Sequence, residues 1–509
     1  MSRWIPEAHR CICPGPRIGV ASSKSRLLSS SETFYWHDYE TFGVDPAYDR
    51  PSQFAGLRTD LDLNLIGEPL VIYAQPPRDY VPHPDACLIT GITPQTALAE
   101  GVVEAQFMST ILDEFMKPGT CAVGYNSLRF DDTVTRATLY RNLRDPYARE
   151  YGDGRSRWDL IDVVRTAYAL RPEGLNWPTR DDGLPSFRLE DLCKANGLEQ
   201  GQAHDALVDV KATIALARAI KDKQPRLFDW LFRQRFKQAV KPLLDPMAQP
   251  VLHVSGMFGA RRANLGLILP LAVHYQNRNE VICADLSVDA ALIIDLPAEE
   301  LHRRLYTSNA DLGEGEVRPG IKSVHINRCP VLLPEKMADA AVAERSGLDL
   351  AVCHGNLQRL RAYDERMPGA LRDKLRAVSE LSGREPETDP DRMLYSGGFI
   401  PKEDRRTLDR VLALTPEDLA TTTVAFEDTR LEEMLFRYRA RNYPETLNDE
   451  ERARWEEYRF ARISEGDGRS LNLEDLNGII EERLIAAQIT DRDRHVLEEL
   501  QRWGDSLLA

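Results

Sequence analysis

Residues 34–41 read Phe-Tyr-Trp-His-Asp-Tyr-Glu-Thr, an apolar and aromatic run that predicts a buried β-strand. Two acids, Asp38 and Glu40, interrupt its second half. Because side chains alternate along a strand, these carboxylates leave the same face with Cα atoms about 7 Å apart. Acids in so apolar a strand are costly to bury unless a cation accompanies them. The spacing therefore predicts a cation site, although a strand end emerging into water has the same short pattern.

A second acidic pair follows the short strand predicted at residues 121–125. Asp131 and Asp132 stand where this strand leads into a helix predicted over residues 131–142. A carboxylate there can face the edge of the sheet, and it can equally cap the helix N-terminus. We expect one of the two acids to cap the helix and the other to take part in chemistry.

The third element, residues 203–213, reads Ala-His-Asp-Ala-Leu-Val-Asp-Val-Lys-Ala-Thr. His204 and Asp209 are five residues apart, so on one continuous helix they would point about 140° from each other. They converge if Asp205 caps a helix that begins near Ala206, because His204 then lies on the entering loop. Asp209 interrupts an apolar run, so its charge needs a partner such as a metal ion.

Four acids and one histidine from three elements suit two-metal chemistry at a phosphodiester. Mg²⁺ prefers oxygen ligands and needs no cage of cysteine or histidine. Two such ions about 4 Å apart activate a water and stabilise the leaving oxygen. A histidine, with an unperturbed pKa near ~6.5, can take the proton from that water. The plainer alternative for His204 is a capping or packing role.

The composition is that of a globular protein of several domains, with 509 residues and a formal net charge of −15. This charge argues against binding nucleic acid through bulk charge, so any such site is a local patch. Residues 129–171 hold nine arginines against seven acids, and Tyr147 and Trp158 offer faces for base stacking. Each arginine taken alone could equally be a solvated charge or an ion-pair partner.

The eight scattered cysteines suit a reducing cytoplasm, and no apolar run is long enough to span a membrane.

The pattern changes three times along the chain. Residues 1–31 contain a single acid and no hydrophobic periodicity, so we expect a disordered N-terminal extension. Strands and helices interleave over residues 32–223, which indicates an α/β domain, and strand-like segments over residues 224–381 indicate a β-rich domain. Helical spacing prevails over residues 382–509, after a linker-like stretch at its start.

Longer strings within the chain resemble the DEDD exonucleases of the histidine-base subclass and, among them, the exodeoxyribonuclease I family. In the α/β unit these strings are His37–Gly43, Leu88–Pro94, Gly124–Asn126 with Arg129–Asp132, Ser156–Leu160, Tyr168–Gly174, Gly183–Glu190, and His204–Ala206 with Asp209. Beyond it they are His253–Ala260, His325–Pro330 and Tyr438–Pro444. The likeness runs from about Phe34 to Arg462, and both termini depart from it.

This resemblance implies an α/β ribonuclease H-like exonuclease domain, an SH3-like β-rich domain and a C-terminal helical domain that clamps single-stranded DNA. It implies single-strand-specific 3′ to 5′ release of 5′-mononucleotides by two-metal phosphodiester hydrolysis, in DNA repair and recombination. The expected cofactor is Mg²⁺, as two ions, with Mn²⁺ as a substitute. The expected partners are single-stranded DNA and the C-terminal tail of single-stranded DNA-binding protein, with the chain a cytoplasmic monomer that does not associate with membranes.

Carried over position by position, the resemblance makes Asp38, Glu40 and Asp209 the main metal ligands, Asp131 the support of a second metal, and His204 the general base. The positions that resemble strand-contacting residues are Arg136, Tyr147, Arg165, Arg171 and Arg188. Two alternatives remain: a 3′ to 5′ exoribonuclease of the same superfamily, and a non-catalytic scaffold that binds single-stranded DNA.

Overall fold

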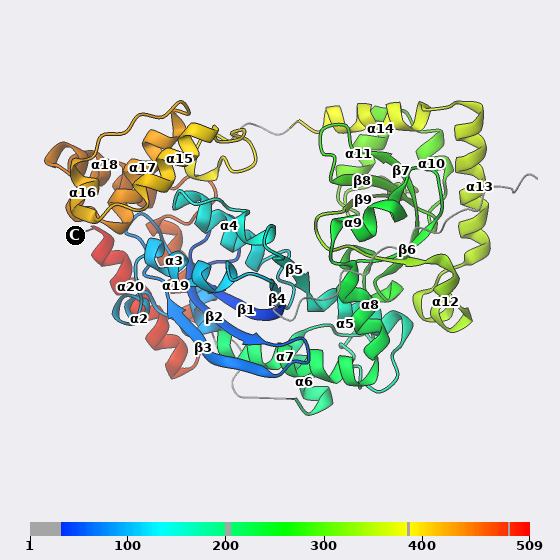
Figure 1. Ribbon diagram of the computed structural model, residues 1–509, viewed down its shortest axis with the longest axis horizontal. Helices are drawn as coiled ribbons and strands as arrows, with labels where there is room; N and C mark the ends of the chain where they lie inside the picture. The colour runs from blue at the N-terminus through cyan, green and yellow to red at the C-terminus, as the bar shows by residue number, and fades with distance from the viewer. Residues whose placement is uncertain (1–31, 199–204, 384–386, 487–488, 509) are drawn as a thin grey trace, which may run out of the picture.

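The computed structural model describes residues 32–198, 205–383, 387–486 and 489–508 (Figure 1). They form two five-stranded sheets, each with its own helices, and a group of C-terminal helices beside the first sheet. The extension predicted at residues 1–31 lies outside the described residues. Within the described ranges, every helix is too short or too polar to cross a membrane.

The first sheet has the strand order β3-β2-β1-β4-β5. Its strands are β1 (Thr33–Thr41), β2 (Pro51–Thr59), β3 (Leu65–Tyr73), β4 (Thr120–Gly124) and β5 (Ser156–Asp159). β1 pairs antiparallel with β2 and parallel with β4, so the carboxyl ends of β1 and β4 meet at one edge. The apolar run at residues 34–41 is confirmed as the central strand, and it is buried because neighbouring strands flank both its sides.

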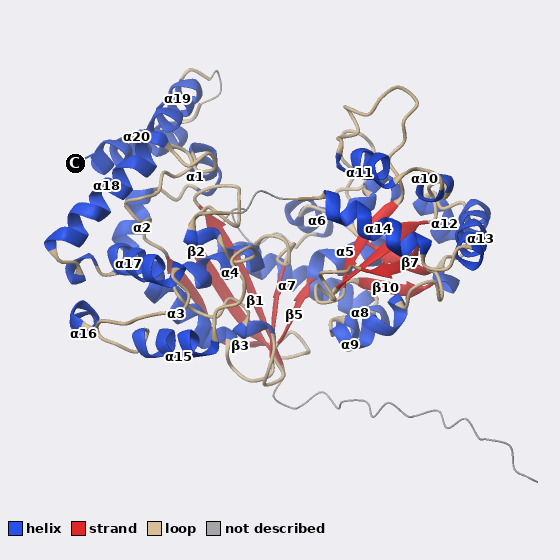
Figure 2. Cartoon of the chain, turned by 90° about the horizontal axis from the view of Figure 1, so that it is seen from above, coloured by secondary structure: helices blue, strands red, loops and turns tan. Residues whose placement is uncertain are grey.

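Helices accompany this sheet (Figure 2). α7 (Ala206–Lys223) packs against β1 and β2, and Asp205 caps it by accepting hydrogen bonds from the amides of Leu207 and Val208. The predicted cap of this helix is therefore confirmed. The other helices of this unit are α1 (Pro84–Thr90), α2 (Pro94–Glu100), α3 (Glu104–Phe115), α4 (Asp131–Arg141), α5 (Leu160–Leu170) and α6 (Leu189–Asn196).

The second sheet is antiparallel and has the order β10-β6-β7-β8-β9. Its strands are β6 (Val251–Val254), β7 (Leu265–Val273), β8 (Glu280–Asp285), β9 (Ile321–His325) and β10 (Val331–Pro334). The same region contains helices that the strand-like pattern did not predict: α8 (Pro225–Gln234), α9 (Lys237–Val240), α10 (Ala291–Ile294), α11 (Ala298–Tyr306), α12 (Ala340–Ser346), α13 (Leu350–Arg366) and α14 (Ala370–Leu381). α14 packs on β7 and α11 because Leu371, Leu375 and Val378 give it one apolar face.

The C-terminal helices are α15 (Lys402–Val411), α16 (Pro416–Thr421), α17 (Arg430–Asn442), α18 (Asp449–Glu465), α19 (Leu473–Leu484) and α20 (Asp491–Leu508). α17 and α18 confirm the helices expected from the spacing of their apolar residues. α20 packs on α1 and α2, and α19 on α1, so the chain ends against the first unit.

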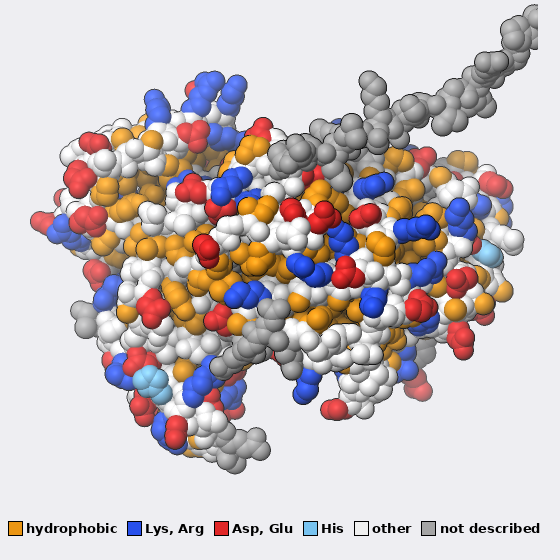
Figure 3. Space-filling model, turned by 60° about the horizontal axis from the view of Figure 1, so that its bottom comes forward, with side chains coloured by type: hydrophobic (Ala, Val, Ile, Leu, Met, Phe, Trp, Pro, Cys, Tyr) orange, Lys and Arg blue, Asp and Glu red, His pale blue; other side chains and the backbone are white. Residues whose placement is uncertain are grey.

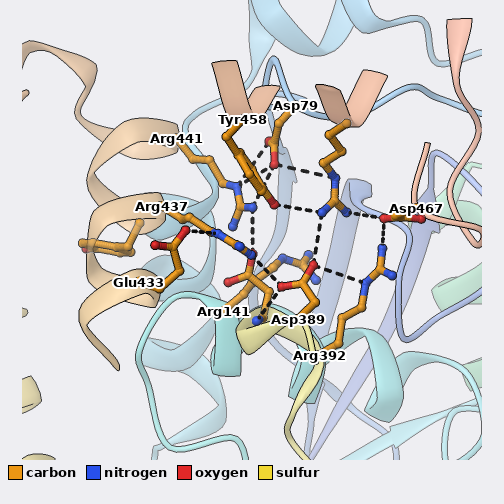
Figure 4. Close-up of polar contacts among 12 residues, drawn as sticks. Asp79, Arg141, Asp389, Arg392, Glu433, Arg437, Arg441, Tyr458 and Asp467 are labelled. Carbon is orange, nitrogen blue, oxygen red and sulfur yellow. Dashed lines mark hydrogen bonds and ion pairs between the residues drawn. The ribbon is translucent and has the colours of Figure 1, made fainter. Parts of the chain in front are cut away.

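A buried ion-pair network joins the C-terminal helices to the first unit (Figure 4). Asp79, which precedes α1, pairs with Arg441 of α17 at 2.8 Å, and Arg441 also pairs with Asp391 at 2.7 Å. Further members are Asp389, Arg392, Arg437, Arg462 and Asp467. Although burial alone would raise it, Arg441 holds the pKa of Asp79 well below its usual range. Charge as well as apolar packing therefore holds this interface together.

Candidate active site

Asp38 and Glu40 are half-buried and lie on the same face of β1, near its carboxyl end. Tyr39, between them, is turned to the opposite face, where its ring packs against Phe54 at a centroid distance of 4.8 Å. This alternation confirms that the two acids share a face, as the spacing predicts.

α7 brings a third carboxylate to this face. The amide of Ala206 donates a hydrogen bond to Gln53 Oε1 on β2 at 3.3 Å, which ties the start of α7 to the sheet. Asp209 follows in the first turn of α7. Asp38, Glu40 and Asp209 each offer an oxygen atom, and these atoms all lie within 4.8 Å of one another. Three carboxylate oxygens at this separation fit one divalent cation of the oxygen-preferring kind.

Asp131 is the fourth acid of the cluster. Its Oδ1 accepts a hydrogen bond at 3.1 Å from the backbone amide of Tyr39. It is buried, and its charge acts on Asp38, whose pKa it raises after the larger effect of burial. β1, α4 and α7 thus bring to one place the four acids that the sequence singles out.

The helix cap expected from Asp131 or Asp132 is wrong. α4 begins at Asp131, and its N-cap position, Phe130, provides no side-chain hydrogen bond. Asp132 is buried and pairs instead with Arg149 and Arg157. The two arginines come from later segments of the chain, so the local pattern around α4 contained no sign of them.

Electrostatic repulsion among the acids shows that the cluster suits a cation. Burial first, and then repulsion from Asp209 and Asp131, raises the pKa of Glu40 to about 8. Burial, followed by Asp131, Glu40 and Asp209, raises the pKa of Asp38 well above its usual range. A bound divalent cation would relieve this repulsion and favour the ionised carboxylates. The donor set, all carboxylate oxygen, therefore fits a divalent metal centre.

His204, the expected general base, lies outside the described residues. The next residue, Asp205, is the N-cap of α7, and Asp209 lies in the first turn of that helix. Another histidine, His37, adjoins Asp38 but is buried among Phe54 and Phe115. Burial lowers the pKa of His37 to about 3, so this ring stays neutral in the core.

The expected strand-contacting residues occupy different environments. Arg188 is exposed just before α6 and borders an open groove of about 470 Å³ with Arg180 and Lys194. Arg171 is exposed, whereas Arg165 is largely buried and pairs with Asp162 at 2.9 Å.

Arg136 is buried and pairs with Glu150 at 2.6 Å, and the ring of Tyr147 lies 5.6 Å from its guanidinium carbon. Six of the nine arginines in residues 129–171 pair with acids: Arg136, Arg141, Arg149, Arg155, Arg157 and Arg165. In Figure 3, Lys and Arg are interspersed with Asp and Glu on the face shown. Trp158 is 4% exposed and packs on Phe228, so the stacking face expected from it is wrong.

A cavity of about 1120 Å³ lies where the two sheet units and the C-terminal helices meet. Tyr147 lines it, and so do aromatic residues that sequence reasoning missed: Tyr151, Phe236, Tyr395 and Phe399. Phe399 is 93% exposed although it is fully apolar. These rings come from three separate parts of the chain, so no local spacing connected them.

Comparisons with known proteins show which family this chain resembles. A family model described as Exonuclease matches residues 35–217, one described as Exonuclease I SH3-like domain matches residues 235–380, and one described as Exonuclease I C-terminal domain matches residues 388–507. Exodeoxyribonuclease I of Escherichia coli (strain K12) is 50% identical over 429 residues, which cover 84% of this chain and 89% of that protein. The Haemophilus influenzae enzyme of the same name is 45% identical, over 85% of this chain and 90% of that protein.

Solved structures give the same result. A moderately thermophilic exonuclease I from Methylocaldum szegediense matches with a TM-score of 0.88 at 47% identity, over 94% of this chain and 100% of that chain. The zinc-bound form of an E. coli ExoI–ssDNA complex matches with a TM-score of 0.87 at 44% identity, over 94% and 100% of the two chains. A structure described as an ExoI/SSB-Ct complex has a TM-score of 0.87 at 44% identity, over 94% and 99%. This chain belongs to the exodeoxyribonuclease I family.

Proposed function

We propose that this chain is a single-strand-specific 3′ to 5′ exodeoxyribonuclease that releases 5′-mononucleotides by metal-dependent phosphodiester hydrolysis. One observation carries the proposal: Asp38, Glu40 and Asp209 offer oxygens within 4.8 Å of one another, with Asp131 beside them, in a chain of this family. We also propose that the chain acts in DNA repair and recombination and that it is a cytoplasmic monomer.

Each acid has a proposed role. Asp38, Glu40 and Asp209 hold divalent metal, and Asp131 supports a second ion from the start of α4. We assign Mg²⁺ as the physiological metal, used as two ions, with Mn²⁺ able to replace it. When bound, the metal supplies charge stabilisation and an acidified water. His204, which directly precedes the cap residue Asp205 in the sequence, would take a proton from the attacking water.

The cavity where the three parts meet is the proposed path of the DNA strand. Tyr147, Tyr395 and Phe399 offer ring faces there, and bases of any sequence stack on such faces. Arg188 and Arg171 are exposed, and Arg188 pairs with Glu190 at 3.0 Å at the surface. Arg136 and Arg165 act from within buried ion pairs. The E. coli structure with single-stranded DNA supports this assignment by its similarity.

We also propose a division into an extension (1–31), an exonuclease domain (32–223), an SH3-like domain (224–381) and a helical domain (382–509). The matches to three family descriptions support it. The similarity to the ExoI/SSB-Ct structure supports the C-terminal tail of single-stranded DNA-binding protein as a second partner.

The test uses end-labelled single-stranded DNA, duplex DNA and single-stranded RNA, each with Mg²⁺ and with EDTA. We expect mononucleotides to be released from single-stranded DNA only, and only with metal. Release from RNA at an equal or higher rate would indicate an exoribonuclease instead. If the chain binds single-stranded DNA but releases no mononucleotides with either Mg²⁺ or EDTA, it is a non-catalytic scaffold.

A further inference from the structure

Asp131 is held in place by its surroundings rather than by its own helix. α4 starts at Asp131 without a side-chain cap, and the amide of Asp132 donates instead to the carbonyl oxygen of Ser127 at 2.8 Å. The Asp132 carboxylate adds ion pairs with more distant segments of the chain. Because Asp131 and Asp132 are adjacent in one helical turn, whatever fixes Asp132 also fixes the backbone that carries Asp131.

Three arginines pair with the Asp132 carboxylate. Arg149 donates to Oδ1 and Arg157 to Oδ2, and Arg136 of α4 lies 3.8 Å from Oδ2. All four side chains are at most 7% exposed. A charge-assisted contact in such a dry environment has little freedom to move.

Arg157 has a second set of contacts, beyond the first sheet. Its Nη2 donates to the carbonyl oxygen of Asn327 at 3.0 Å and pairs with Glu150 at 2.9 Å. The carbonyl oxygen of Arg157 accepts a hydrogen bond from the Cys329 thiol at 3.2 Å. Asn327 and Cys329 lie between β9 and β10, so they belong to the second unit. The Arg157 guanidinium therefore contacts both Asp132, the residue next to Asp131, and the second unit.

We propose that Arg157 is a positioning residue of the nuclease reaction, which sets the first turn of α4 and the Asp131 carboxylate by holding Asp132 on one side and the Asn327 carbonyl on the other. Docking of the second unit and the geometry of the metal site are linked through this side chain. The inference rests on the proposed function, because it takes Asp131 to be a support for metal. Groups that orient metal ligands typically contribute about 10- to 100-fold to metal affinity or activity.

Arg157→Lys tests the proposal. A lysine keeps the charge, but its single ammonium cannot reproduce the planar fork that spans Asp132, Glu150 and Asn327. We expect Mn²⁺ affinity, measured by calorimetry on the full chain without DNA, to fall about 10-fold or more. Turnover should fall as well.

Arg58→Lys is the matched control. Arg58 lies on the same sheet, is also largely buried, and pairs with Glu114 at 3.1 Å, without contact to the acidic cluster. The Arg58→Lys protein should be less stable than the original chain, while its Mn²⁺ affinity stays within about twofold of the affinity of the original chain. Equal Mn²⁺ affinity in a folded Arg157→Lys protein and in the original chain would overturn the proposal, because Arg157 would then serve stability alone.

Glu150→Gln provides a second, milder variant in case Arg157→Lys does not fold. It removes one partner of Arg157 and should lower Mn²⁺ affinity in the same direction by a smaller factor. A folded Glu150→Gln protein with unchanged affinity and turnover would count against the proposal. Failure of the original chain to bind Mn²⁺ is a different result, since it would refute the proposed metal site itself.

Discussion

Asp131 accepts a hydrogen bond at 3.1 Å from the backbone amide of Tyr39, the residue that separates Asp38 from Glu40 in β1. The acid from α4 is thereby fixed to the main chain of the strand that carries two other members of the cluster. Because a backbone amide moves only with its strand, this hydrogen bond ties the Asp131 carboxylate to β1.

Asp38→Asn should abolish cleavage while single-stranded DNA binding in EDTA is retained, because the acid holds metal and the aromatic cavity holds the strand. The substitution also removes one of several mutually repelling charges. We expect the melting temperature in EDTA to rise by about 2–4 °C, the shift that ~1 kcal/mol produces in a chain of large domains. Asp62→Asn, at a largely exposed site, is the control and should change neither cleavage nor the melting temperature. Lost DNA binding would show that Asp38 is structural.

Stability without metal should depend on pH through Glu40. Its folded-state pKa is raised to about 8, whereas in the unfolded chain it ionises near pH ~4.3. Between these values the folded state binds more protons than the unfolded state, so stability falls as pH rises. The melting temperature in EDTA should therefore fall more steeply from about pH 5 to about pH 8 in the original chain than in Glu40→Gln. Identical slopes would contradict the raised pKa.

His204→Ala should lower turnover by about 10² to 10⁴, the usual contribution of a general base. Mn²⁺ affinity should stay the same, because the metal ligands are carboxylates. The measurement is single-turnover cleavage of labelled single-stranded DNA beside calorimetry with Mn²⁺. Near-normal turnover would remove His204 from the mechanism, and lost metal binding would make it a ligand.

Phe399→Ala should weaken single-stranded DNA binding by about 1–3 kcal/mol, the usual contribution of one stacked base. Phe399 is 93% exposed, so its removal leaves folding intact and isolates the stacking effect. Fluorescence anisotropy with a labelled oligonucleotide in EDTA measures the change. Ile485→Ala, at a residue 85% exposed and outside the cavity, is the control and should bind as the original chain does. Equal affinities of the two variants would place the strand elsewhere.

Arg441→Met should lower the free energy of unfolding by about 3–5 kcal/mol, because it removes the arginine nearest to the buried Asp79 and one of the two arginines paired with Asp391. Arg454→Met removes an exposed ion pair with Glu433 and should cost about 0–1 kcal/mol. Urea unfolding of both variants in one buffer gives the comparison. A small loss for Arg441→Met would mean that apolar packing alone holds the C-terminal helices.

Local patterns were enough to predict the elements that carry the chemistry. The strand at residues 34–41, the shared face of Asp38 and Glu40, and the cap at Asp205 depend on neighbours a few residues away, and all three were predicted correctly. The family, too, was recognisable from short strings of residues.

Only the tertiary structure decided which charges meet. Trp158 was expected to stack on bases, yet it is buried because β5 lies against α8 and its Phe228. Asp132 was a helix cap by its position, yet Arg149 and Arg157 reach it from later segments. The physical reason is that periodicity records which face a residue occupies, whereas the partner of a buried charge is set by how distant segments pack.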